Sequence, residues 1–205
     1  MVAIEIICQT ALLAEEIAQG THPAQPREDG RSQEAPRNAP LIAVVRGYPR
    51  SGKTSTLQAL LDDLRQDGLT VGGVSQPVIL KDNQRQGYRL RDEATGEERP
   101  FAQRRIPKSP EELGYSFDPE GWTWATERIL QARQRAQVVV VDELGRLEAA
   151  GQGHIPALKE AIPHEKARLW LLAVREEFAE GLEAQVGPFK LTLPAGATAK
   201  ERRSF

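Results

Sequence analysis

The sequence predicts an α/β fold of three layers, with helices on both sides of a mostly parallel central sheet of about five strands. Three observations support this class. Short apolar runs alternate with amphipathic stripes from residue 41 onwards, which favours parallel strands joined by helices. A glycine-rich loop follows the first run, and an acidic pair ends a later one. A polar and glycine-rich stretch between them predicts an inserted β-hairpin or meander.

The first strand is predicted over Leu41-Ile-Ala-Val-Val, directly before the loop Gly47-Tyr-Pro-Arg-Ser-Gly-Lys-Thr54. The G-x-x-x-x-G-K-[ST] spacing of this loop is typical of a backbone that wraps around a polyphosphate at the start of a helix. The leucines that follow, at positions 57, 60, 61 and 64, have the i, i+3, i+4, i+7 spacing of an amphipathic helix. The residues predicted to bind nucleotide are Gly47, Tyr48, Pro49, Arg50, Ser51, Gly52, Lys53, Thr54 and Ser55.

The meander is predicted between residues 70 and 103. Residues 70–80 form an extended segment that glycines and Pro77 interrupt, residues 88–91 alternate as a strand, and residues 99–103 add a third. The basic stretch that follows, residues 103–116, contains two arginines and a lysine. It is the candidate for a lid over phosphates.

Asp118-Pro119 predicts the start of the next helix, because aspartate is a good N-cap and proline suits the first turn. An apolar stripe continues through Trp122, Ala125, Ile129 and Ala132. The tryptophans at 122 and 124 could stack on a base, although their place in a helical pattern favours core packing or surface cover.

The buried strand Val138-Val-Val-Val141 ends in Asp142-Glu143. Ligands bind at the carboxyl edge of parallel sheets, so we expect this pair near the phosphate loop. Asp142, with the Thr54 hydroxyl, is predicted to hold Mg²⁺, and Glu143 to orient and deprotonate an attacking water. Lys53 is predicted to neutralise phosphate charge.

Two further strands are predicted, over residues 169–174 and 189–193. Between them, Phe178, Leu182 and Val186 lie at i, i+4 and i+8, the spacing of one helical face.

The segments Asp142-Glu-Leu-Gly-Arg-Leu-Glu148 and Gly151–Leu158 resemble a signature of the THEP1-type nucleoside-triphosphatases, as do Gly72-Gly-Val, Gly87–Asp92 and Thr95-Gly-Glu97. The resemblance covers roughly residues 40 to 176. It implies a P-loop NTPase fold with an extra strand between the phosphate-loop strand and the acidic strand. It also implies slow, Mg²⁺-dependent hydrolysis of nucleoside triphosphates such as ATP and GTP.

Carried over by position, the resemblance gives Gly47–Thr54 to phosphate, Asp142 to the metal shell and Glu143 to water activation. In that layout the strand before Arg175 lies beside the loop, so its guanidinium could contact the γ-phosphate as a catalytic group. The alternative is an ordinary charged residue at a helix start. This chain departs from the family at Arg50, where a small residue or glycine is more common, and at Arg146, where proline or lysine often stands.

Composition excludes several other classes. The 27 lysines and arginines are interspersed with 29 aspartates and glutamates, for a net charge of −2, so we expect no nucleic-acid partner, and a footprint for one would have to be local rather than global. A single cysteine excludes an internal disulfide framework. The apolar runs are much shorter than the ~20 residues of a membrane span, and we expect a cytoplasmic protein. The three histidines lack metal-ligand spacing and are predicted at the surface or in loops.

Residues 1–40 are predicted to form an N-terminal helix and a flexible linker, before a P-loop NTPase domain over residues 41–205. The N-terminal segment could bind a protein partner. Two alternatives to a triphosphatase stay open at this point. One is a nucleotide-dependent adapter, resembling GTP-binding accessory proteins of molybdopterin-cofactor assembly, and the other is a small-molecule or nucleoside kinase.

Overall fold

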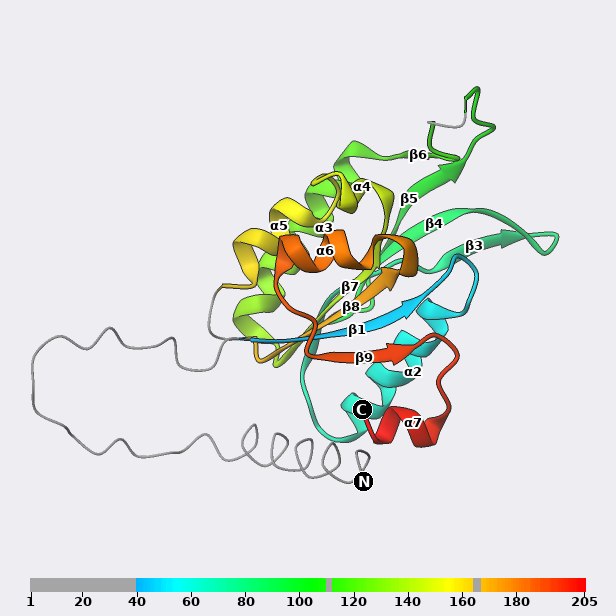
Figure 1. Ribbon diagram of the computed structural model, residues 1–205. Helices are drawn as coiled ribbons and strands as arrows, with labels where there is room; N and C mark the ends of the chain where they lie inside the picture. The colour runs from blue at the N-terminus through cyan, green and yellow to red at the C-terminus, as the bar shows by residue number, and fades with distance from the viewer. Residues whose placement is uncertain (1–39, 110–111, 164–166) are drawn as a thin grey trace, which may run out of the picture.

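The computed structural model describes residues 40–109, 112–163 and 167–205 (Figure 1). The N-terminal helix and linker predicted over residues 1–40 lie outside these ranges except for Pro40, at which the described part begins. The domain boundary predicted near residue 41 therefore stays a prediction.

Five parallel strands form the centre of the sheet; four of them match the predicted apolar runs, whereas the fifth lies in residues 70–80, the extended segment assigned to the meander. In spatial order they are β2 (Val71–Ser75), β7 (Val138–Leu144), β8 (Leu169–Arg175), β1 (Leu41–Gly47) and β9 (Leu191–Pro194). The strand between the loop strand β1 and the acidic strand β7 is β8, in agreement with the resemblance. Gly47 and Arg175, the last residues of β1 and β8, are register partners.

The sheet has nine strands among the described residues, so the expectation of about five was too low. The four others are antiparallel: β3 (Val78–Lys81), β4 (Gln84–Asp92), β5 (Glu98–Arg104) and β6 (Tyr115–Phe117). They do not form a separate insertion, because β4 pairs with the edge of β2 and extends the same sheet. Strand β6, which lies in the stretch predicted as a lid, was missed because it has only three residues.

Helices cover both faces of the sheet (Figure 1). One face carries α3 (Pro119–Arg135), α4 (Arg146–Ala149), α5 (Ile155–Ala161) and α6 (Ala179–Val186), with a 3₁₀ turn at Glu176–Phe178 before α6. The other carries α2 (Lys53–Gln66) and the short α7 (Ala199–Arg203). Helices α4, α5 and α7 were not predicted from the sequence, because they are too short to show a helical period.

Successive side chains of the central strands point to opposite faces of the sheet, so each strand packs under helices on both sides. In β1, Ile42 and Val44 belong to the core under α3, α5 and α6, whereas Ala43 and Val45 belong to the core under α2. Both sets are buried, with at most 3% of each side chain exposed. Strands buried on both faces are continuously apolar rather than alternating with polar residues, which is why these segments read as unbroken runs.

The start of α3 is as predicted. The Asp118 carboxylate accepts a hydrogen bond of 3.1 Å from the Glu120 N–H, and Pro119 is in the first turn. Trp124 is only 7% exposed, so core packing explains this tryptophan.

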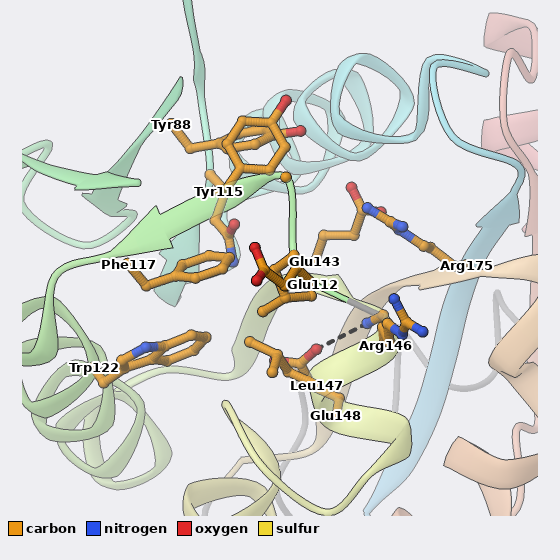
Figure 2. A pocket seen from close by; sticks show the side chains of 14 residues that line it. Tyr88, Glu112, Tyr115, Phe117, Trp122, Glu143, Arg146, Leu147, Glu148 and Arg175 are labelled. Atoms are coloured by element: carbon orange, nitrogen blue, oxygen red, sulfur yellow. Dashed lines mark hydrogen bonds and ion pairs between the residues drawn. The ribbon is translucent and has the colours of Figure 1, made fainter. Parts of the chain in front are cut away.

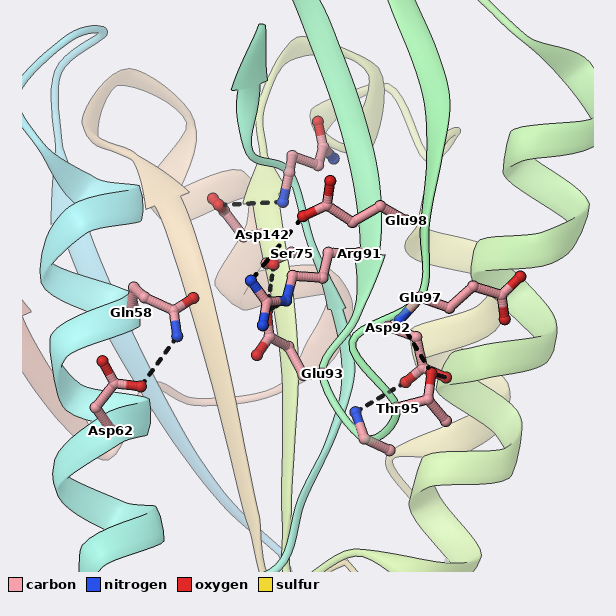
Figure 3. A network of polar contacts seen from close by, with 12 residues as sticks. Gln58, Asp62, Ser75, Arg91, Asp92, Glu93, Thr95, Glu97, Glu98 and Asp142 are labelled. Carbon is pink, nitrogen blue, oxygen red and sulfur yellow. Dashed lines mark hydrogen bonds and ion pairs between the residues drawn. The ribbon is translucent and has the colours of Figure 1, made fainter.

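A buried carboxylate fastens the antiparallel strands to the parallel ones. Glu93, which follows β4, accepts a hydrogen bond from the Ser75 hydroxyl at the end of β2. Its carboxylate also pairs with Arg65 of α2 at 2.6 Å and lies 3.8 Å from Arg91 of β4. Figure 3 shows Ser75, Arg91 and Glu93 meeting between α2 and β4. Because β2 and β4 share only two register pairs, this network adds a polar connection to a short ladder.

A substitution at Gly73 would show how tightly β2 packs on β7. Its φ is +98°, and a Cβ atom there would lie 2.1 Å from the Val140 carbonyl oxygen. We expect Gly73→Ala to lower the free energy of unfolding by about 3 kcal/mol, from left-handed strain and overpacking together. Gly68 has a φ of +81° and open space around it, so Gly68→Ala is the control and should cost about 1 kcal/mol. Urea denaturation that gave equal losses for both variants would contradict this account.

Candidate active site

The candidate site lies at the carboxyl ends of β1, β7 and β8, the edge where open α/β sheets bind ligands. Two glycines shape the loop between β1 and α2. Gly52, directly before α2, has a φ of +92°, which favours glycine. A Cβ atom on Gly47 would lie 2.4 Å from the Ser51 hydroxyl oxygen and 2.7 Å from the Ala195 Cβ. The motif spacing thus reflects a tight turn.

Lys53 is the first residue of α2 and is 4% exposed. Its ammonium donates a hydrogen bond of 2.9 Å to the Tyr48 carbonyl oxygen, within the same loop. The ammonium also lies 3.6 Å from Oε1 of Glu143. Loop and acidic strand therefore meet at this lysine, although they are about 90 residues apart in the chain.

Asp142 is completely buried. It is hydrogen-bonded to the Thr54 side chain, and the Gln76 N–H donates to Oδ2 at 3.5 Å. The pKa of Asp142 is raised to about 7, first by burial and then by the neighbouring Glu143 charge, while Thr54, Gln76 and Lys53 act in the opposite direction. Its Oδ1 atom is buried and has no hydrogen-bond partner among the described residues.

These features fit a magnesium ion. A buried carboxylate with an unsatisfied oxygen is costly without a cation, and a hydroxyl lies next to it. Within the described residues, no group of three or more histidine, cysteine, aspartate or glutamate side chains could hold a metal. Proteins often bind Mg²⁺ through one or two carboxylates together with substrate phosphates, and the Asp142 carboxylate with the Thr54 hydroxyl offers such oxygens.

Glu143 forms an ion pair with Arg175, whose Nε donates to Oε1 at 2.7 Å. The charge of Glu143 and this hydrogen bond outweigh partial burial, so the pKa of Arg175 is raised. Gly145 makes room for the guanidinium: a Cβ atom there would lie 3.2 Å from the Arg175 Nε. The register of β1 and β8 thus brings Arg175 to the site, as the resemblance implied.

A cavity of about 240 Å³ opens beside Glu143. Figure 2 shows aromatic side chains gathered on one side of it and arginines on the other, with Glu143 between them. The aromatic residues are Tyr88, Tyr115, Phe117 and Trp122, and the arginines are Arg146 and Arg175. The cavity lining includes no residue of the phosphate loop. Trp122, unlike Trp124, lines this cavity and also packs against the core.

Three buried residues that the sequence analysis did not assign support the acidic pair. Glu148 accepts hydrogen bonds from the Gly145 N–H at 2.9 Å and the His154 N–H at 3.3 Å, which fixes the turn after β7. His154 lies in the turn before α5, in agreement with a loop position, but it is 1% exposed and is therefore not at the surface. The Gln76 side-chain amide pairs with the His154 Nε2 at 3.2 Å. Glutamate three residues after Gly145 was a signal for such a cap.

The structure thus brings five predicted residues to one place: Lys53, Thr54, Asp142, Glu143 and Arg175. Other loop residues are open to solvent, with Tyr48 65% exposed. The predicted lid contributes Glu112, Leu113, Gly114 and Tyr115 to the cavity lining, whereas residues 110–111 lie outside the described part. The structure has no helix in its described ranges that is long and apolar enough to cross a membrane. The roles predicted for these side chains stay predictions.

Known proteins resemble this chain along most of its described length. A protein-family model described as NTPase matches residues 43–194. The nucleoside-triphosphatase THEP1 of Korarchaeum cryptofilum is 28% identical over 118 residues, which are 57% of this chain and 60% of that relative. The THEP1 of Thermofilum pendens is 30% identical, with 65% of this chain and 74% of that relative covered. The chain thus spans between three fifths and three quarters of these relatives.

Two solved structures share the fold. The solution structure of a human cancer-related nucleoside triphosphatase superimposes with a TM-score of 0.58 at 18% identity, over 80% of this chain and 92% of that one. The crystal structure of THEP1 from Aquifex aeolicus gives a TM-score of 0.54 at 16% identity, over 79% and 92%. At these identities the likeness concerns architecture alone.

The burial of His154 leads us to predict that the stability of the protein depends on pH. Burial lowers its pKa from 6.5 to about 4, so between these values the unfolded chain binds more protons and acid favours unfolding. We expect the free energy of unfolding to fall by about 2 kcal/mol more in the wild type than in His154→Gln between pH 7 and pH 5. Denaturation curves of both proteins measure this difference, and parallel losses would contradict it.

We predict that replacing Arg50 with glycine stabilises the protein. Its φ is +67°, a left-handed conformation in a non-glycine residue. Arg50→Gly should raise the free energy of unfolding by about 1 kcal/mol, because glycine adopts this conformation without strain. Thermal denaturation tests this, with the exposed Arg104→Gly as a control for loss of charge. An unchanged or lower stability in Arg50→Gly would count against strain in the loop.

Proposed function

The chain belongs to the NTPase family, and on this premise we propose that it hydrolyses nucleoside triphosphates to diphosphate and phosphate with Mg²⁺. ATP and GTP are the substrates we expect. The observation that supports this best is the meeting of loop and acidic pair: the Lys53 ammonium lies 3.6 Å from Glu143, and Thr54 is hydrogen-bonded to Asp142.

Lys53 and the loop backbone bind the phosphates in this proposal. The ammonium leaves the Tyr48 carbonyl and contacts the β- and γ-phosphates, where it neutralises charge that develops in the transition state. The N–H groups at the start of α2 add the positive end of the helix dipole.

Glu143 orients and deprotonates the attacking water. The water oxygen forms a bond to the γ-phosphorus, the bond to the β–γ bridging oxygen breaks, and the water proton passes to the carboxylate. Lys53 and Arg175 both approach Oε1, which leaves Oε2 as the oxygen that accepts the proton. Arg175 holds this side chain in place and brings a positive charge close to the γ-phosphate.

Thr54 and Asp142 would hold the magnesium ion. When bound, Mg²⁺ supplies positive charge to the phosphate oxygens. The Thr54 hydroxyl and the Oδ1 of Asp142, which has no hydrogen-bond partner among the described residues, are the oxygens that would bind it. The buried Asp142 side chain is held by Gln76, so its orientation is set before any ligand binds.

A cytoplasmic location and a protein partner for the N-terminal segment are further parts of this proposal. The first follows from the single cysteine and mixed charge, and the second concerns residues outside the described part of the chain.

Glu143→Gln tests the proposed base. The amide keeps the shape of the side chain but accepts no proton, so we expect phosphate release to fall at least about 100-fold. Nucleotide affinity should stay close to that of the wild type, because the loop and the metal residues are unchanged. Phosphate release from MgATP and MgGTP, and equilibrium binding of the same nucleotides, give the two values.

Glu97→Gln is the matched control, since Glu97 is an exposed carboxylate in the turn between β4 and β5. It should hydrolyse both nucleotides at the wild-type rate. Normal turnover in Glu143→Gln would reject Glu143 as the base, while loss of binding in that variant would show that the side chain acts on affinity.

A further inference from the structure

The cavity beside Glu143 is not explained by hydrolysis alone. A few polar groups are enough to position an attacking water molecule, yet four aromatic side chains line one side of this space. Tyr88 and Tyr115 form one ring pair at 5.1 Å, and Phe117 and Trp122 another at 5.4 Å. Rings that face a cavity offer flat surfaces to a planar ligand.

The base of the hydrolysed nucleotide does not fit this place. A loop lysine of this type contacts the β- and γ-phosphates, and Glu143 lies 3.6 Å from Lys53. Glu143 therefore marks the γ-phosphate end of the nucleotide, which a sugar and two further phosphates separate from the base. Since the cavity lies at Glu143 and no residue of the loop lines it, its ligand would be a second molecule.

The lining defines the chemical class of that molecule. Carboxylates and guanidinium groups both line the cavity, among them Glu143, Glu112, Arg146 and Arg175, so neither strongly charged anions nor cations are favoured. Gln76 adds an amide. At about 240 Å³ the space is small for a ligand site, where about 300–1,000 Å³ is usual. A neutral heterocycle of nucleoside size, stacked on the rings, suits these limits.

We infer that this cavity is an acceptor pocket for a nucleoside, whose hydroxyl group reaches Glu143 and receives the γ-phosphoryl group. The inference rests on the proposed function, because it uses the same phosphate site and the same base. The hydroxyl oxygen forms a bond to the γ-phosphorus, the bond to the β–γ bridging oxygen breaks, and the nucleoside diphosphate leaves with the electron pair. The hydroxyl proton passes to the Glu143 carboxylate.

Water fills the pocket when no nucleoside is bound, and hydrolysis is then the reaction observed. Arg175 serves both reactions, since it holds Glu143 and lines the cavity. A nucleoside that binds should therefore reduce phosphate release as it takes up the phosphoryl group.

The test uses the full chain with Mg²⁺ and ATP labelled at the γ-phosphate, in the presence of adenosine, guanosine, cytidine or uridine. Chromatography separates labelled nucleoside monophosphate from free phosphate. We expect at least one nucleoside to receive label while free phosphate falls, with one ADP formed for each labelled product.

Variants of the aromatic side place the nucleoside in the cavity. In Phe117→Ala the KM for the nucleoside should rise about tenfold, from loss of one stacked ring. Phe117→Tyr keeps the ring and should restore the KM. Tyr115→Leu gives a second variant if Phe117→Ala folds poorly, and Leu80→Ala, at an exposed position on β3, is the control.

The outcomes separate this inference from the proposed function. If all label goes to free phosphate with each of the four nucleosides, the acceptor pocket is rejected and hydrolysis stands. If label transfers but the KM is the same in both aromatic variants and the control, the nucleoside does not bind in this cavity. If the protein releases no label from ATP in any form, both proposals fail.

Discussion

The contact between Lys53 and Glu143 joins the two halves of the site, and the rest of the arrangement depends on it. Their charged atoms lie 3.6 Å apart, at the ends of segments that the sheet brings together through β8. Glu143 is in turn paired with Arg175 at 2.7 Å. The two cations hold this carboxylate at the sheet edge, so the fold itself sets the geometry for charge neutralisation.

Burial of polar groups is the cost of this arrangement, and each buried group has a structural reason. Asp142 is enclosed with one unsatisfied oxygen, which a bound cation would compensate. Glu148 caps the turn that follows β7, and His154 holds the Gln76 amide whose backbone contacts Asp142. Strain at a loop residue such as Arg50, with a φ of +67°, is of the kind that functional loops retain.

The aromatic cavity shows how the antiparallel strands contribute to function. Tyr88, Tyr115 and Phe117 come from β4 and β6, whereas Glu143 and Arg175 come from the parallel centre. Because β4 extends the sheet from β2, these rings are placed next to the acidic strand end. One wall of the cavity therefore comes from the meander and the other from the parallel strands. The meander thus supplies part of the candidate site.

The sequence by itself determined the phosphate loop, four of the five parallel strands and the acidic pair, since their signals are local: motif spacing, apolar runs and an N-cap at Asp118. It did not reveal that the meander continues the same sheet, because pairing such as Val74 with Asp92 depends on which edge is open. Nor could it find the buried state of His154 or the cavity beside Glu143. Burial and cavities arise from packing between distant segments, and no residue pattern along the chain encodes them directly.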